Sequence, residues 1–195
     1  MNKGELRTMV VGYLKRSDFS SIEFDQWVRF ANVRIGRSLR GQDNLVALAV
    51  TPTANPVALP LDYRAMRSVE SSQNNSTFRL RAMDAAFNTL PLSGGGFAVA
   101  YRIRGFEMEL RPFAAVPLNL EYWQAPAELV TDNQTNAVLT AQPMLYLYAV
   151  LMEGAVWAQD ANAAQAYAGV FGTEVEELNI QGQNANLGDT PTMGA

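Results

Sequence analysis

Two glutamates, Glu107 and Glu109, come closest to a catalytic arrangement in this sequence. They lie in the segment YRIRGFEMELRP (101–112), in which apolar and charged residues alternate. Such alternation is typical of a half-buried β-strand and places both carboxylates on one face. Paired carboxylates are the groups that glycoside hydrolases use as general acid and as base or nucleophile. The segment therefore raises the question whether the protein is an enzyme.

The expected strand register favours a structural role for this pair. We predict a two-residue turn at Arg104 and Gly105, although a three-residue bulged loop is an alternative. This register gives an apolar face with the pairs Ile103–Phe106, Tyr101–Met108 and Val99–Leu110, and a second face with the pairs Arg102–Glu107 and Ala100–Glu109. Opposite charges across a sheet contribute about 0.2–1 kcal/mol each. A neighbouring cation also disfavours the protonated carboxyl group that a general acid needs.

Other catalytic sites are excluded by the residues that the sequence lacks. It contains no histidine and no cysteine, which removes Ser-His-Asp and Cys-His sites, thiolate metal sites and disulfides. It has no phosphate-binding loop, no dinucleotide-binding glycine pattern and no calcium-loop pattern. SGGG (93–96) lacks a following lysine and is interpreted as a mobile loop. We expect no catalytic residue, no cofactor and no metal.

The net charge of −4 is unevenly distributed. Residues 1–40 hold eight Lys/Arg and four Asp/Glu, and no Lys or Arg follows Arg111, whereas nine acids do. The basic N-terminal helices can fold against acidic C-terminal helices of the same chain, or the two surfaces can meet between subunits. Nucleic-acid binding by the N-terminal arginines is the weaker interpretation in an acidic protein.

No segment predicts insertion into a membrane. The N-terminal residues do not have the apolar core of a signal peptide, and the longest apolar run, Met144–Met152, is too short to span a bilayer. We expect a soluble protein that is made and kept in a cytoplasm.

Helical periodicity is present at both ends of the chain. It predicts helices over residues 4–15, 22–39, about 143–160 and about 162–180, the second with an N-cap at Ser20 or Ser21 followed by Glu23. The helix that begins at Pro143 is apolar nearly all round, which indicates cover on every side and suggests subunit contacts in addition to core contacts. Trp27, Trp123 and Trp157 are expected in the core.

Ile22, Phe30 and Val33 lie among arginines on the second helix, which is unusual for a solvated face. They either pack under a loop of the same chain or form an interface, where apolar and arginine side chains mix. The interface hypothesis includes Arg29, Phe30, Val33, Arg34, Arg37, Tyr146, Tyr148, Glu174, Glu176 and Glu177.

Between the helices, short runs separated by Pro, Asn and Gly predict an antiparallel β domain. We therefore expect an α+β fold, a helical bundle built from N- and C-terminal helix pairs with a central β domain inserted between them. The expected parts are residues 1–42 with 143–180 (helical), 43–130 (β), 131–142 (linker) and 181–195 (flexible tail).

Four segments in this order resemble the head-to-tail adaptor, or neck, proteins of short-tailed and other tailed bacteriophages. They are YLKRSDFSSIEFDQWVRFANVRIGRSLR, LPLDYRAMRSVE, YRIRGFEMELRP running on to LNLEYWQAPAEL, and LYLYAVLMEGAVWAQDANAAQAYAGVFGTEVEELN. The likeness covers Leu6 to Asn179. The segment TDNQTNAVLTAQP departs from the family pattern, and Tyr167 stands where a tryptophan is expected.

The resemblance implies a non-enzymatic virion protein that forms a homo-oligomeric ring, typically of twelve copies, beneath the portal and joins the portal to the tail. It also implies assembly in the host cytoplasm, a nozzle or further neck protein as tail-side partner, and DNA that passes through without specific binding. A C-terminal arm would reach the portal, with Asn184, Leu187 and Met193 as the hypothetical contacts.

Two other functions remain as alternatives at this point. One is a carbohydrate- or surface-binding module with the β domain as platform and the helices as stalk, for which loss of binding in Trp123→Ala would be the evidence. The other, less favoured, is a glycosidase that uses Glu107 or Glu109.

Overall fold

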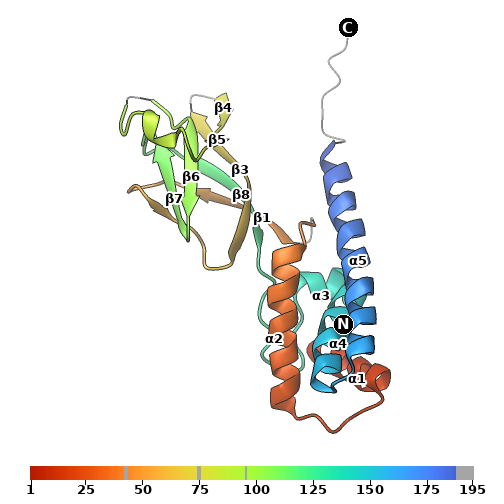
Figure 1. The fold of residues 1–195 in the computed structure, drawn as a ribbon. Helices are drawn as coiled ribbons and strands as arrows, with labels where there is room; N and C mark the ends of the chain where they lie inside the picture. Colours follow the sequence, from red (N-terminus) through yellow and green to blue (C-terminus); the bar gives the residue numbers. More distant parts are fainter. Residues whose placement is uncertain (42–43, 74–75, 95, 188–195) are drawn as a thin grey trace. The chain divides into compact units, whose positions relative to one another are not determined.

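A computed structural model describes residues 1–41, 44–73, 76–94 and 96–187 (Figure 1). It confirms the α+β class, with a β region between N- and C-terminal helices. The chain divides into two compact units. The helical unit contains the described residues of Met1–Asn44 and Ala125–Ala195, and the β unit contains those of Leu45–Gln124. No helix in the described part of the chain is long and apolar enough to cross a membrane.

Within the described residues, the helical unit has two helices before the β unit and three after it. They are α1 (Lys3–Leu14), α2 (Ser21–Ser38), α3 (Ala137–Ala141), α4 (Pro143–Trp157) and α5 (Ala161–Leu187). The predicted cap of α2 is confirmed at Ser20, whose side chain accepts a hydrogen bond from the Glu23 backbone N–H while the Glu23 carboxylate accepts one from the Ser20 backbone N–H. Such a capping box satisfies two N–H groups that a helix start leaves without partners.

The apolar helix α4 is covered mainly by its own unit. Its central side chains are fully buried and share one core with residues of α1, α2, α3 and α5. Trp27 and Trp157 belong to this core, where they pack against Phe19 and each other. Only Met144 and Val156, near the two ends of α4, are more than a third exposed among its large apolar side chains. The helix therefore does not need a second subunit to cover its circumference.

Two helices extend into segments that were not expected to be helical. Helix α3 lies within the segment expected to be a linker, and its Val138 and Leu139 join the helical core. Asn136 starts this helix by accepting a hydrogen bond from the Leu139 N–H (2.8 Å), while its own amide donates to the Ala127 carbonyl (2.9 Å). The last helix continues beyond Ile180 to Leu187, into the expected tail.

The described residues of the β unit form two four-stranded sheets. The first has the order β1-β8-β3-β4 and the second has the order β2-β7-β6-β5. Their bounds are β1 Leu45–Val50, β2 Val57–Ala58, β3 Tyr63–Gln73, β4 Ser76–Arg79, β5 Arg81–Ala82, β6 Ala100–Arg104, β7 Glu107–Arg111 and β8 Leu118–Gln124. All pairs are antiparallel except β5 with β6, which is parallel and departs from the all-antiparallel expectation. Side chains from both sheets form one apolar core.

The predicted hairpin register is wrong, because the turn lies one residue later in the sequence than predicted. The structure pairs Arg104 with Glu107, Arg102 with Glu109 and Tyr101 with Leu110, so the turn is Gly105–Phe106. Gly105 has a φ of 61° and Phe106 does not have a positive φ, as in a type II′ turn, which favours glycine at its first central position. Because moving the turn by one residue shifts every cross-strand partner by two, the apolar side chains remain on one face.

Gly154 on α4 marks a close contact between helices and gives a first prediction. A β-carbon at this position would lie 2.8 Å from Leu14 Cδ1 and 3.3 Å from Trp27 Cζ3. We expect Gly154→Val to lower the free energy of unfolding by about 1–3 kcal/mol through overpacking, measured by urea denaturation. Gly12→Val is the matched control, because a β-carbon there meets nothing within 4 Å. Equal stability of the two variants would contradict the packing.

Candidate functional site

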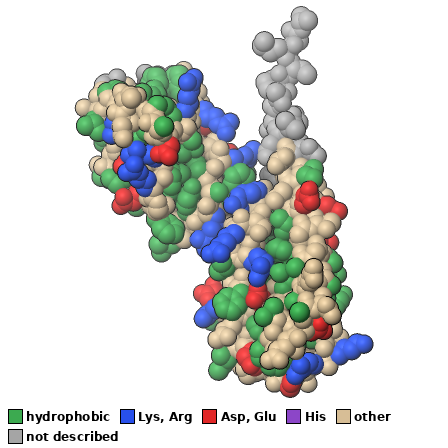
Figure 2. Space-filling model, in the orientation of Figure 1, with side chains coloured by type: hydrophobic (Ala, Val, Ile, Leu, Met, Phe, Trp, Pro, Cys, Tyr) green, Lys and Arg blue, Asp and Glu red, His purple; other side chains and the backbone are tan. Residues whose placement is uncertain are grey.

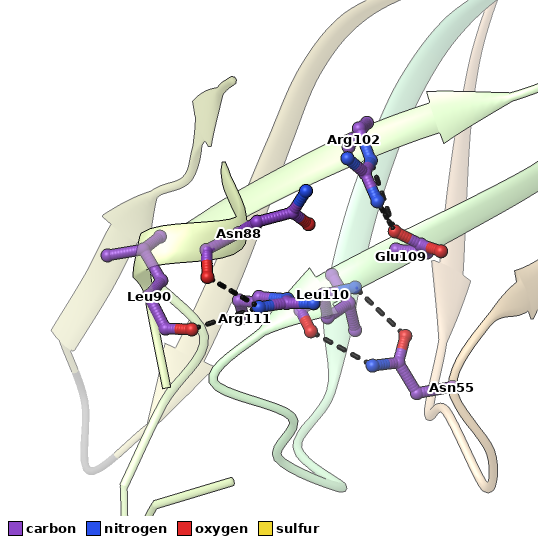
Figure 3. A network of polar contacts seen from close by, with 7 residues as sticks. All are labelled: Asn55, Asn88, Leu90, Arg102, Glu109, Leu110 and Arg111. Carbon is purple, nitrogen blue, oxygen red and sulfur yellow. Dashed lines mark hydrogen bonds and ion pairs between the residues drawn. The ribbon is translucent and has the colours of Figure 1, made fainter. Parts of the chain in front are cut away.

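The two candidate catalytic glutamates lie on β7 and have different surroundings. Glu109 accepts two hydrogen bonds from Arg102, one from Nε at 3.1 Å and one from Nη2 (Figure 3). Arg102 is 7% exposed, and its guanidinium lies over the ring of Phe87 at 4.6 Å. Glu107 is exposed next to the hairpin turn. The predicted ion pair of Arg102 with Glu107 is thus replaced by one with Glu109, because of the shifted turn.

The charged face of this hairpin contacts the segment 87–90 of the same unit. Arg111 Nη1 donates to the carbonyls of Asn88 (3.2 Å) and Leu90 (3.0 Å), and its guanidinium lies 5.0 Å from the Phe87 ring centre. Arg102 and Arg111 therefore both contact the ring of Phe87, which is fully buried. Figure 3 shows Arg111 with its partners Asn88 and Leu90, and Arg102 with Glu109.

Asn55, just before β2, hydrogen-bonds to the backbone of Leu110 in β7. Its side-chain amide donates to the Leu110 carbonyl (3.0 Å), and its side-chain oxygen accepts from the Leu110 N–H (2.9 Å), as a strand partner would (Figure 3). Of the two candidate glutamates, Glu109 is thus bound by Arg102 of the neighbouring strand, whereas Glu107 is exposed. Within the described residues, no group of three or more His, Cys, Asp or Glu side chains could hold a metal ion.

The candidate interface on α2 is an exposed surface of mixed character. Phe30 is 56% exposed and Val33 is 41% exposed, so neither packs under a loop of the unit. We call the surface around them the α2 groove. It has a volume of about 620 Å³ and is lined by Phe30, Val33, Arg34, Arg37, Ser38 and Glu153. Exposed apolar patches rimmed by polar residues are typical of protein–protein contacts, so this surface is the candidate interface.

The charges of the α2 groove are only partly neutralised by the chain itself. Arg34 forms an ion pair with Glu153 of α4, and Arg29, on a neighbouring turn of α2, forms one with Glu128 (2.8 Å). These contacts support the interpretation that basic N-terminal helices fold against acidic C-terminal residues. Arg37 is exposed and has no acidic partner among the described residues. The groove therefore presents an unpaired positive charge beside two exposed apolar side chains.

Glu153 is a groove residue that the sequence analysis missed. It is the only charged residue of α4, which is otherwise almost entirely apolar. A lone charge in an apolar helix needs a partner, and this signal could have pointed to an arginine of α2.

The acidic candidates lie on α5 together with exposed apolar side chains. Glu176 and Glu177 are exposed and Glu174 is half-buried, and none has an ion-pair partner among the described residues. Val170, Glu177 and Ile180 are spaced by seven and three residues and so share one helix face. Val170 is 39% exposed and Ile180 is 49% exposed. We call the residues Val170, Glu174, Glu177 and Ile180 the α5 stripe, and Figure 2 shows acidic side chains gathered over α5.

The two tyrosines of α4 do not belong to the same surface. Tyr146 is fully buried and therefore cannot contact another subunit, which removes it from the candidate interface. Its hydroxyl donates to Asn32 Oδ1 and accepts a hydrogen bond from Asn136 Nδ2 (3.2 Å). Tyr148 is half-buried against Tyr167, with 6.3 Å between the ring centres. Periodicity missed this distinction because α4 is apolar on all sides.

The remaining candidates lie at the chain's end and in the β unit. Asn184 and Leu187 are in the last turns of α5, and Met193 lies outside the described residues. Trp123, the residue that would test the alternative carbohydrate hypothesis, is half-buried in β8 between Leu45 and Ala65 of the neighbouring strands.

Comparisons with known proteins agree with the resemblance described above. A protein-family model described as "SU10 adaptor protein" matches residues 1–192. A search of curated proteins found no match.

Proposed function

Because the chain belongs to the SU10 adaptor family, a family of phage head–tail adaptors, we propose that it forms a ring that joins the portal to the tail. Membership implies a virion component of the phage neck that interacts with other phage structural proteins. It also implies a structural, non-enzymatic role. The proposed ring has twelve copies, lies beneath the portal, and assembles in the host cytoplasm.

The observation that supports self-association is that one subunit has two different surfaces that are complementary to each other. The α2 groove offers exposed Phe30 and Val33 with the unpaired Arg37. The α5 stripe offers exposed Val170 and Ile180 with glutamates that have no ion-pair partner among the described residues. Apolar contact with opposite charges favours the groove of one subunit against the stripe of the next. Since the two surfaces differ, the contact is head-to-tail, and it produces a ring when the rotation closes.

The contacts with the portal and the tail are assigned by the same proposal. The C-terminal arm, with Asn184 and Leu187 at the end of α5 and Met193 further along the sequence, reaches the portal, and the β unit meets the nozzle or next neck protein. DNA passes through the ring without specific binding. An acidic chain makes few favourable phosphate contacts, and phosphate contacts supply most of the affinity of DNA-binding proteins.

The test is the mass of the particle that the chain forms with its portal. Mass photometry of the chain mixed with portal rings should show a complex heavier than the portal by a fixed multiple of 21.4 kDa. Negative-stain images should show an added ring on one end of the portal. Portal alone and the chain alone are the controls. A mixture that contains only free portal and free monomer would refute the proposal.

A further inference from the structure

Strand β1 is an edge of the first sheet and is available for pairing. It pairs with β8 from Leu45↔Trp123 to Val50↔Leu118, and no strand of the described chain pairs with its other side. In an antiparallel strand, every second residue directs its N–H and C=O groups away from the partner. The outer side of β1 therefore presents a row of backbone donors and acceptors.

This edge lacks three of the features that protect edge strands: a charged residue, a proline and a bulge. Its sequence, LVALAV, contains no charged residue and no proline, although both are common means of blocking an edge. The pairing of β1 with β8 is continuous, without a bulge. Ala47, Leu48 and Ala49 in the middle of the strand are exposed. A regular, apolar and uncharged edge strand is a template for another strand.

The apolar face of the sheet also continues to this edge. Val46, Leu48 and Val50 lie opposite Tyr122, Leu120 and Leu118, which are buried in the β core. Val46 and Val50 pack partly against that core, whereas Leu48 is 36% exposed. One more strand beside β1 would satisfy its backbone groups and cover Leu48.

The opposite edge of the same sheet is β4, whose four residues are all exposed. Since β1 is antiparallel to β8, β8 to β3, and β3 to β4, strand β4 runs antiparallel to β1. If β4 of a second copy lay beside β1 and ran antiparallel to it, the strand directions would continue to alternate across the contact.

We propose that β1 of one copy pairs with β4 of the next, so that the first sheet continues from subunit to subunit. The occupant of the β1 edge is thus a second copy of this chain. The contact joins two different edges and is head-to-tail, like the contact between α2 and α5. The pairing rests on the proposed ring for the presence of a neighbouring copy, and the test separates the two ideas.

Disulfide cross-linking tests the pairing directly because the chain contains no cysteine. Ala49 lies in register with Asn119, Glu70 and Arg79, so Ala47, Ala49 and Thr77 share the sheet face away from the apolar core. One copy carries Ala47→Cys or Ala49→Cys, and a second copy of different tag length carries Thr77→Cys. Facing residues of paired strands are close enough for a disulfide.

Oxidation of portal-bound assemblies should give a mixed disulfide at least tenfold more abundant than disulfides between identical copies. Rings that give no mixed disulfide from either position would overturn the pairing and leave the proposed ring intact. Predominant Ala49→Cys homodimers would also overturn it, because they indicate β1 against β1. A chain that stays monomeric with the portal would refute both proposals.

A charge on the edge is the second test. Leu48→Lys should reduce assembly at least tenfold, because the new charge would lie on the apolar face of the sheet, between β8 and the side chains of the added strand. Phe106→Lys is the matched control: it is 51% exposed and lies in the hairpin turn of the second sheet. Circular dichroism checks that both variants fold. A folded Leu48→Lys variant that assembles like the unmodified chain would overturn the pairing.

Discussion

Tyr146→Ala should lower the free energy of unfolding of the helical unit by about 3–5 kcal/mol, the range for removing a buried aromatic ring. Tyr146 is fully buried in the first turn of α4, within the core to which α1, α2, α3 and α5 also contribute. Its ring fills the space that the substitution would leave empty. Urea denaturation followed by circular dichroism measures the loss.

The hydroxyl group of Tyr146 adds a polar contribution to this core. It connects Asn32 of α2 with Asn136, the residue that caps α3. Tyr146→Phe is the matched variant, since it keeps the ring and removes only these two hydrogen bonds. Leaving buried partners unsatisfied costs about 1–3 kcal/mol. The prediction fails if Tyr146→Ala is no less stable than Tyr146→Phe.

The same hydroxyl should make the free energy of unfolding decrease at alkaline pH. Burial raises the pKa of Tyr146 well above its usual value near 10. The stabilisation is fully present below pH 10 and is lost as the pH rises, because the unfolded chain ionises before the folded one does. Burial also raises the pKa values of Tyr101 and Tyr122, so Tyr146→Phe should flatten the alkaline decline without abolishing it.

Phe30→Glu should weaken ring assembly by about 30- to 1000-fold, which corresponds to the roughly 2–4 kcal/mol carried by an interface hot spot. Phe30 is the most exposed apolar side chain of the α2 groove. In the proposed ring, the α5 stripe of the next subunit covers Phe30. The introduced glutamate at position 30 would therefore be a buried negative charge beside Glu174 and Glu177. The mass distribution with the portal, measured against protein concentration, gives the change in affinity.

Ile22→Glu is the matched control, because Ile22 lies on the same helix and is 70% exposed but does not line the groove. It should assemble like the unmodified chain. Both substitutions are at exposed positions, so both variants should keep the stability of the monomer. If Phe30→Glu assembles normally, the α2 groove is not the subunit contact.

A charge exchange tests which surface meets the groove. Arg37→Glu should weaken assembly about tenfold, and the addition of Glu177→Arg should restore part of the loss. Such a rescue requires that the two residues face each other across the contact. The effect should shrink as salt is added, because exposed charges are screened. Loss without any rescue would show that Glu177 does not face Arg37.

The local features of this protein could be predicted from its sequence alone. The cap at Ser20, the start of α4 at Pro143 and the apolar faces of the hairpin all follow from backbone geometry within a few residues. Period and capping are local properties, and so a single segment carries them. Even the wrong hairpin turn kept its apolar residues on one face, because side chains alternate with a period of two residues.

Contacts between distant segments were decided only by the tertiary structure. Tyr146 and Tyr148 are indistinguishable by period, yet one is fully buried and the other half-buried. Arg102 and Arg111 alternate like solvated residues, yet both contact Phe87, which precedes them by 15 and 24 positions. Phe30 and Val33 could have packed under a loop, and only the fold shows them exposed. Burial depends on which remote segment covers a side chain, and local periodicity contains no information about that segment.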